Sequence, residues 1–190
     1  MPLIGRAKAK RFEREAVPHL AAVYRFARQL SDGEVARDLV QETYLRAWKY
    51  FDTFRPETDC RAWLFRILRN VWNDRCRQPR LEIPLPETEE ASVEPYYDWE
   101  GEFLRDELSP EVERALARVP EHYRWALLLA DVEELSYQEI ARVLDCPIGT
   151  VMSRVNRGRR SLARLLRHAE ASADTRGEIS DAADIYDRRD

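Results

Sequence analysis

The chain has 190 residues, of which 44% are hydrophobic and 35% charged, and its formal net charge is −4. This length and composition predict one or two folded domains and exclude a chain that is disordered throughout. The longest apolar run, residues 125–130, is too short to span a membrane, and the first residues lack the apolar core of a signal peptide. We therefore expect a cytoplasmic protein without membrane insertion.

The charge is distributed unevenly along the chain. Residues 1–80 carry a net charge of +7 and residues 114–170 one of +3, whereas residues 81–113 carry −11 and residues 171–190 carry −3. This asymmetry indicates nucleic acid as the partner of the two basic blocks. The acidic segment between them, with prolines at 79, 84, 86 and 95, is predicted to be extended. A linker that is acidic only for solvation remains an alternative for that segment.

No pattern of a catalytic, metal or cofactor site is present in the sequence. The three cysteines lie far apart, the three histidines (His19, His122 and His168) are isolated, and the six glycines form no phosphate-binding loop. There is also no Ser/His/Asp or Cys/His set. We expect no enzymatic activity, no cofactor and no metal ion.

The first half of the chain shows only helical patterning. Pro18 is predicted to start a helix whose apolar stripe comprises Phe12, Leu20, Val23, Tyr24, Ala27 and Leu30. Asp32 is predicted to cap a second helix with one apolar face, formed by Ala36, Leu39, Val40, Thr43, Ala47 and Tyr50.

A third helix is predicted from about Asp59 to Gln78, with two contrasting sides. Its wide apolar side comprises Leu64, Phe65, Ile67, Leu68, Val71 and Trp72. Its opposite, polar side comprises Arg66, Arg69, Asn70, Asn73 and Arg77, with Trp63 at the border. Amides bind base edges and aromatic rings stack on unpaired bases, so single-stranded DNA is a candidate ligand. The alternative is that Trp63 and Trp72 are core residues.

The second half is predicted to contain a helix-turn-helix. Ser109 caps a helix that begins with a proline, and Pro120 starts another. Ser136 and Glu139 form a capping box for a short helix, which the Asp145-Cys146-Pro147 turn ends. A long helix follows, from Pro147 or Ile148 to Arg167. Two helices joined by so short a turn form a helix-turn-helix.

The last helix has a face that is suited to the major groove. Its apolar side comprises Ile148, Val151, Val155, Leu162, Leu165 and Leu166. Its polar side comprises Gly149, Ser153, Asn156, Arg157, Arg160 and Arg164. Arginine pairs with guanine and asparagine with adenine, while further arginines neutralise phosphate. An ordinary solvated basic face is the alternative.

Two pairs of segments resemble one known family. Residues 38–48 (DLVQETYLRAW) and 61–70 (RAWLFRILRN) resemble domain 2 of the extracytoplasmic-function (ECF) sigma factors. Residues 135–141 (LSYQEIA) and 149–159 (GTVMSRVNRGR) resemble their domain 4. The resemblance implies an all-α chain with sigma domain 2 at 10–78, an acidic linker at 79–108, sigma domain 4 at 109–168 and an acidic tail at 169–190.

The resemblance also implies a function and three sets of site residues. A sigma factor binds core RNA polymerase and directs promoter recognition and transcription initiation. The polymerase-binding residues would be Asp38, Gln41, Glu42, Leu45, Arg46 and Lys49. The −10 element, melted into single strands, would be bound by the loop 51–61 and by Arg61, Trp63, Arg66, Arg69, Asn70, Asn73 and Arg77. The −35 duplex would be bound by Ser153, Arg154, Asn156, Arg157, Arg160 and Arg164.

The amino-acid sequences of two segments resemble the oxidative-stress branch of this family most. These segments are residues 12–18 and 147–160. The resemblance implies a role in a stress response under an anti-sigma factor, and in that branch the anti-sigma factor binds zinc. Many relatives carry a basic residue where Met152 stands and an aromatic residue or histidine where Asn156 stands, so −35 specificity cannot be transferred. The competing interpretation is a stand-alone helix-turn-helix regulator whose first half dimerises or senses a ligand.

Overall fold

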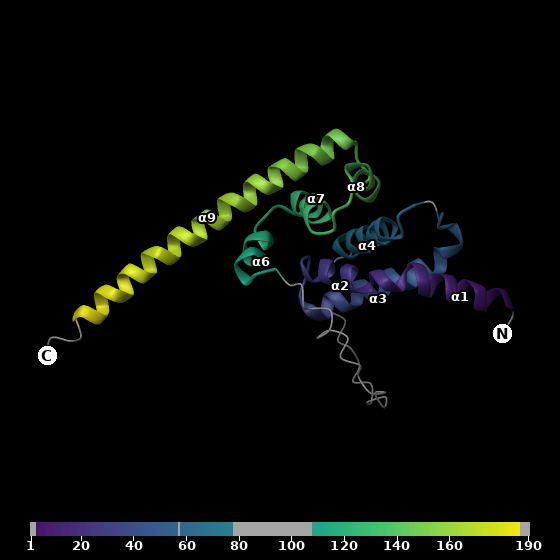
Figure 1. Cartoon of the computed structure of the whole chain (residues 1–190), viewed down its shortest axis with the longest axis horizontal. Coiled ribbons are helices and arrows are strands. Elements are labelled where there is room, and N and C mark those ends of the chain that lie inside the picture. Colours follow the sequence, from purple (N-terminus) through teal and green to yellow (C-terminus); the bar gives the residue numbers. More distant parts are fainter. Residues whose placement is uncertain (1–2, 57, 78–107, 187–190) are drawn as a thin grey trace, which may run out of the picture. The chain divides into compact units, whose positions relative to one another are not determined.

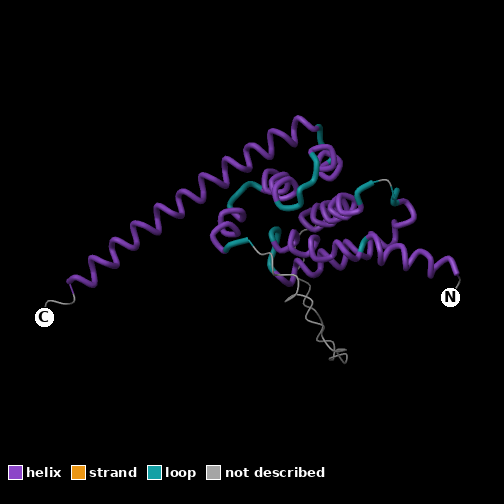
Figure 2. Tube along the Cα trace, in the orientation of Figure 1, coloured by secondary structure: helices purple, strands orange, loops and turns teal. Residues whose placement is uncertain are grey.

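The computed structural model describes residues 3–56, 58–77 and 108–186. Within these ranges the regular structure is helical and contains no strand, as Figure 2 shows, so the all-α fold is confirmed. No helix among these residues combines the length and the apolar character that crossing a membrane requires. Nearly all of the expected linker, residues 79–108, lies outside the described residues. The chain divides into two compact units, each treated by itself below.

The first unit contains four α-helices and two 3-10 turns within residues 3–77. They are α1 (Leu3–Glu15), η1 (Val17–His19), α2 (Leu20–Arg28), α3 (Gly33–Tyr50), η2 (Phe51–Thr53) and α4 (Cys60–Arg77). In Figure 1 these elements run from purple to blue. Both long helices begin at an aspartate. Asp32 Oδ1 accepts the Val35 N–H at 3.0 Å, as predicted, and Asp59 Oδ1 accepts the Arg61 N–H at 2.7 Å.

The core of the first unit lies where α2, α3 and α4 pack against one another. Leu39 of α3, Tyr24 and Phe26 of α2, and Phe65 and Leu68 of α4 are at most 2% exposed. The Phe26 and Phe65 rings have centroids 5.0 Å apart. Truncating a side chain buried to this extent costs about 2–5 kcal/mol of stability. This shared core fixes α2, α3 and α4 relative to one another.

Three details of the first unit differ from the sequence prediction. Phe12 belongs to a separate helix, α1, and packs edge-on against Tyr44 and Phe51. Pro18 lies inside the 3-10 turn and α2 starts only at Leu20, because proline has no N–H to continue the α1 hydrogen-bond ladder. Tyr50 is 50% exposed, since it is the last residue of its helix.

The second unit contains the predicted helix-turn-helix. Its elements are α6 (Pro110–Ala117), α7 (Glu121–Asp131), α8 (Tyr137–Leu144) and α9 (Ile148–Tyr186). Ser109 Oγ accepts the Val112 N–H at 3.4 Å. The capping box is complete, because Glu139 Oε2 accepts the Ser136 N–H at 2.8 Å and Ser136 Oγ accepts the Glu139 N–H at 3.3 Å. Asp145, with φ of 48°, turns the chain from α8 toward α9.

The contact between α7 and α9 is the main packing of this unit. Trp125 and Leu128 of α7 and Val151 and Val155 of α9 are at most 1% exposed. Ile148, expected on the same buried side, is 44% exposed, because it is the first residue of α9 and precedes the crossing with α7.

The end of α9 lies beyond the position predicted for it. The apolar periodicity stops near Arg167, but the helix continues to Tyr186 through most of the acidic tail. Residues 168–186 contain no proline and five alanines, and alanine favours helix even without an apolar face. The expectation that the helix ends at Arg167 was therefore wrong.

Candidate functional site

The outer face of α9 is defined by the residues opposite its buried valines. Asn156, Arg160 and Arg164 are exposed there, while Val151 and Val155 face α7. Arg160 and Arg164 have no ion-pair partner among the described residues. Their charge is thus available to an anion such as a DNA phosphate.

Ser153 lies on this face and Arg157 at its border, and each makes one hydrogen bond. The Arg157 guanidinium donates to the Tyr123 hydroxyl of α7 at 3.2 Å, which directs it along the flank of the helix. The Ser153 hydroxyl donates to the Thr150 carbonyl at 2.9 Å. These two side chains and the outer face lie together, as the sequence predicted.

Arg154 is not brought onto the outer face. It is half-buried, and its Nη1 lies 3.7 Å from the Cys146 sulfur in the turn between α8 and α9. The structure thus places it on the side of α9 next to that turn, apart from the other five residues that the sequence assigned to the −35 element.

Gly158 is a structural requirement that sequence reasoning did not identify. It is buried, and a Cβ there would lie 3.2 Å from the Tyr123 carbonyl oxygen and 3.3 Å from Leu127 Cβ. The α9 backbone therefore lies too close to α7 at this residue for a larger side chain to fit without a shift. The next residue, Arg159, forms an ion pair with Asp131 of α7. The sequence did contain a signal for this requirement, since a glycine inside a helical, arginine-rich segment often marks a close packing contact.

The polar side of α4 is present and accessible. Arg66, Asn70 and Arg77 are exposed, whereas Arg69 and Asn73 are half-buried. The buried side is formed by Leu64, Phe65, Leu68 and Val71. This face therefore offers both guanidinium and amide groups along one helix.

Trp63 lies in an aromatic cluster next to that face. Its ring centroid is 5.1 Å from that of Phe54 and 6.2 Å from that of Phe51. Arg11 of α1 lies over Phe51 at 5.0 Å and donates to the Phe54 carbonyl at 3.5 Å. Trp63 is half-buried by this packing, so it is not one of the fully buried core residues of the first unit. Arg61, at the start of α4, is half-buried too.

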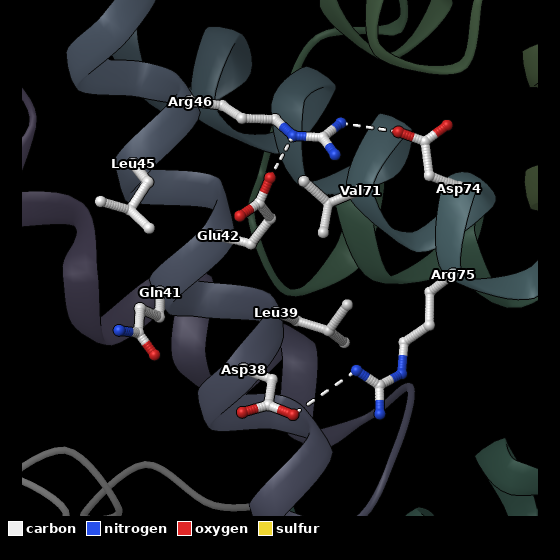
Figure 3. A pocket seen from close by; sticks show the side chains of 9 residues that line it. All are labelled: Asp38, Leu39, Gln41, Glu42, Leu45, Arg46, Val71, Asp74 and Arg75. Carbon is white, nitrogen blue, oxygen red and sulfur yellow. Dashed lines mark hydrogen bonds and ion pairs between the residues drawn. The ribbon is translucent and has the colours of Figure 1, made fainter. Parts of the chain in front are cut away.

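A groove runs between α3 and α4, with a volume of about 510 Å³ (Figure 3). It is lined by Asp38, Leu39, Gln41, Glu42, Leu45, Arg46, Val71, Asp74 and Arg75. Five of the six residues assigned to polymerase binding, all but Lys49, thus line the groove, together with Val71, Asp74 and Arg75 of α4. Gln41 and Leu45 point away from α4 in Figure 3.

Ion pairs connect the two walls of this groove. Arg46 Nη1 lies 2.7 Å from Asp74 Oδ2 and Arg46 Nε lies 2.6 Å from Glu42 Oε1. The hydrogen bond to Asp74 is the main cause that raises the pKa of Arg46, and the one to Glu42 adds to it. Arg75 reaches Asp38 at 3.5 Å. The sequence offered no signal for Asp74 and Arg75, because their partners are far away along the chain.

Three further candidate residues lie on the exposed side of α3, namely Gln41, Leu45 and Lys49. Leu45 is 58% exposed and Gln41 is exposed beside it. The Lys49 ammonium lies 5.5 Å from the Tyr50 ring centroid and is exposed. Leu45 is thus a large apolar side chain that is accessible to a partner on the exposed side of α3.

No metal centre is formed by the part of the chain that the structure describes. No group of three or more His, Cys, Asp or Glu side chains lies there in an arrangement that could hold a metal ion.

Two segments of the chain match known families. Residues 17–81 match Sigma-70 region 2 and residues 109–162 match Sigma-70, region 4. The ECF RNA polymerase sigma factor EcfG of Rhodopseudomonas palustris is 39% identical over 152 residues, which cover 80% of this chain and 81% of the relative. The ECF RNA polymerase sigma-E factor of Escherichia coli K12 is 32% identical, with coverage of 72% and 75%.

Solved structures of similar fold point the same way. The sigma factor RpoE of Bartonella quintana, in complex with the anti-sigma factor NepR, has a TM-score of 0.66 and 32% identity, and the match covers 83% of this chain and 98% of that one. CnrH, in complex with the cytosolic domain of CnrY, has a TM-score of 0.54 and 26% identity, with coverage of 86% and 90%. With both regions present in one chain, a stand-alone helix-turn-helix regulator is not favoured, and the chain belongs to the ECF sigma factors of the sigma-70 family.

Proposed function

We propose that this chain carries out the two DNA contacts and the polymerase contact of an ECF sigma factor with three separate surfaces. The observation that supports this division is that each of the two matched regions exposes an arginine- and asparagine-containing helix face, on α4 and on α9. A regulator that binds only one duplex site needs one such face. Two faces on two units fit a promoter with two elements.

The outer face of α9 binds the −35 duplex. Asn156 and Arg157 lie in the N-terminal third of the helix, the part that enters the major groove in helix-turn-helix proteins. Arg160 and Arg164 follow one and two turns later and bind phosphates. Tyr123 orients Arg157 for this contact through its hydroxyl group.

The polar side of α4, with the loop before it, binds the melted −10 strand. Arg66, Asn70 and Arg77 are accessible to a strand that runs along the helix. The aromatic cluster of Phe51, Phe54 and Trp63 lies beside the start of α4, where unpaired bases would be received. Arg69 and Asn73 contribute from the half-buried border of the same side.

The exposed surface of α3 docks on core RNA polymerase. Leu45 supplies the apolar anchor, and Gln41 and Lys49 surround it with polar contacts. Glu42 and Arg46 contribute mainly through ion pairs. They pair with each other, and Arg46 also pairs with Asp74 of α4, which holds α3 and α4 together. Asp38 does the same through Arg75.

An anti-sigma factor restrains the free protein. Two solved relatives support this, since RpoE of Bartonella quintana is bound to the anti-sigma factor NepR and CnrH to the cytosolic domain of CnrY. The oxidative-stress branch and a zinc-binding anti-sigma factor stay predictions. The chain acts in the cytoplasm with polymerase and has no catalytic activity of its own.

The test is run-off transcription with core RNA polymerase on a library of genomic promoters. Core polymerase with this chain should start transcription at a set of promoters that share one −35 and one −10 element, while core alone should not. If the chain instead binds DNA specifically but neither pulls down core polymerase nor starts transcription, it is a regulator and the proposed function is wrong.

A further inference from the structure

The outer face of α9 includes an exposed apolar side chain that none of the proposed DNA contacts uses. Met152 is 54% exposed, and at 100° per residue it stands about 40° around the helix from Asn156. It therefore borders the same face as the candidate base-reading residues. Ile148, one turn earlier and 44% exposed, extends this apolar edge toward the start of the helix.

Exposed single apolar residues are common on protein surfaces and need no special cause. Met152 differs in its position. The surrounding outer face is polar, and the side chain lies within the first two turns of a helix whose N-terminal part would enter the major groove. A flexible, polarisable thioether is also suited to contacts of irregular shape.

The backbone beside Met152 leaves room for close approach. Gly149 stands about 20° around the helix from Asn156, and a Cβ added there would meet no atom within 4 Å. Because Gly149 has no side chain, the helix backbone is accessible at the start of α9, and the Met152 side chain projects beyond it. In the major groove, the apolar group that distinguishes thymine from the other bases is its C5 methyl.

We propose that Met152 is a specificity-determining residue that contacts the C5 methyl of a thymine in the −35 element. This inference rests on the proposed function and adds one base to those that α9 recognises in the −35 element. Asn156 and Arg157 recognise hydrogen-bonding edges, whereas Met152 recognises a methyl group. An apolar side chain at this position selects thymine where a lysine or arginine would favour a guanine or a phosphate.

The methyl group can be removed from the DNA without changing any hydrogen bond. The full chain is assembled with core polymerase, and its affinity is measured for promoter duplexes in which each −35 thymine is replaced in turn by deoxyuridine. One replacement should weaken binding about fourfold, the factor expected for one buried methyl-sized group. Met152→Ala should cause a similar loss on the thymine duplex and no further loss on the deoxyuridine duplex.

Two further variants separate this contact from general damage. Met152→Leu should keep most of the sensitivity to the methyl group, and Val132→Ala, at another exposed apolar residue after α7, should keep all of it. The inference is overturned if the −35 element contains no thymine, if no deoxyuridine replacement matters, or if Met152→Ala remains as sensitive as the wild type. Absence of transcription from every promoter would instead refute the proposed function.

Discussion

The Tyr123 hydroxyl of α7 accepts a hydrogen bond from the Arg157 guanidinium of α9 at 3.2 Å. The two residues belong to different helices, and both side chains remain open to solvent at this contact. A long arginine side chain on a surface ordinarily samples many rotamers. The contact with Tyr123 removes part of this freedom before DNA is bound, so that less entropy is lost on binding.

We therefore expect Tyr123→Phe to lower selectivity for the −35 sequence about threefold to tenfold while the fold is kept. The phenylalanine retains the ring and loses only the acceptor. Holoenzyme binding to promoters with the preferred and a mutated −35 element gives the selectivity, and circular dichroism reports on the fold. Unchanged selectivity would mean that Arg157 needs no support from α7.

Base-reading and phosphate-binding residues on α9 should give different signatures. Asn156→Ala or Arg157→Ala should reduce affinity for the preferred −35 sequence about 5- to 150-fold and relax selectivity there. Arg160→Ala or Arg164→Ala should weaken binding to all sequences alike and lower the slope of log K against log salt by about 1 per lost phosphate contact. Titrations at several salt concentrations separate the two classes. Full selectivity in the Asn156/Arg157 double variant would contradict the assignment.

Leu45 tests the polymerase-docking surface. It is 58% exposed, so Leu45→Asp should abolish pull-down of core polymerase and leave the circular dichroism spectrum and the melting temperature unchanged. The matched control is Leu39→Asp on the same helix. Leu39 is 1% exposed, and a buried carboxylate there should unfold the first unit. A Leu45→Asp variant that binds polymerase normally would remove this surface from the proposal.

His19 gives the first unit a pH dependence. Burial lowers the pKa of His19 below its usual 6.5, against Asp59, which raises it, and with a smaller lowering effect of Arg61. The unfolded chain therefore binds a proton at a higher pH than the folded one. The contribution of neutral His19 to stability is present above pH 6.5 and is lost as the pH falls below that value.

We expect the free energy of unfolding to fall less steeply below pH 6.5 in His19→Gln than in the wild type. An NMR titration of the His19 ring should give a midpoint below 6.5. A midpoint above 6.5 would show that the Asp59 carboxylate outweighs burial, and the pH dependence would then have the opposite sign.

Local signals in the sequence correctly predicted where three of the helices, α3, α6 and α8, start. The Asp32 cap, the Ser109-Pro110 start and the Ser136–Glu139 box each involve residues within four positions of one another, so their geometry follows from the sequence alone. The buried faces of α3 and α4 were predictable as well, because helical periodicity defines them.

Contacts between distant residues were not predictable in this way. Arg46 and Asp74 are 28 positions apart, and Arg157 and Tyr123 are 34 apart. Which side chains meet depends on how the helices cross, and periodicity carries no information about that. The same reason explains Phe12, whose aromatic partners lie on α3 and η2, and Trp63, whose position next to Phe54 is set by the path of the loop.

The last prediction concerns the crossing of α7 and α9, which Gly158 makes possible. A Cβ at Gly158 would already lie 3.2 Å from the Tyr123 carbonyl oxygen, and the two further methyl groups of valine have no space. Gly158→Val should therefore lower the free energy of unfolding by about 1–3 kcal/mol. It should also weaken −35 binding, because α9 and the residues on its outer face are displaced from α7.

Gly149 is the matched control on the same helix. It has open space around it, so Gly149→Ala should leave stability unchanged or raise it by up to about 1 kcal/mol. Urea unfolding of the full chain measures both variants. If Gly158→Val is as stable as the wild type, α7 and α9 can separate without cost, and the close crossing would not be what positions Asn156 and Arg157.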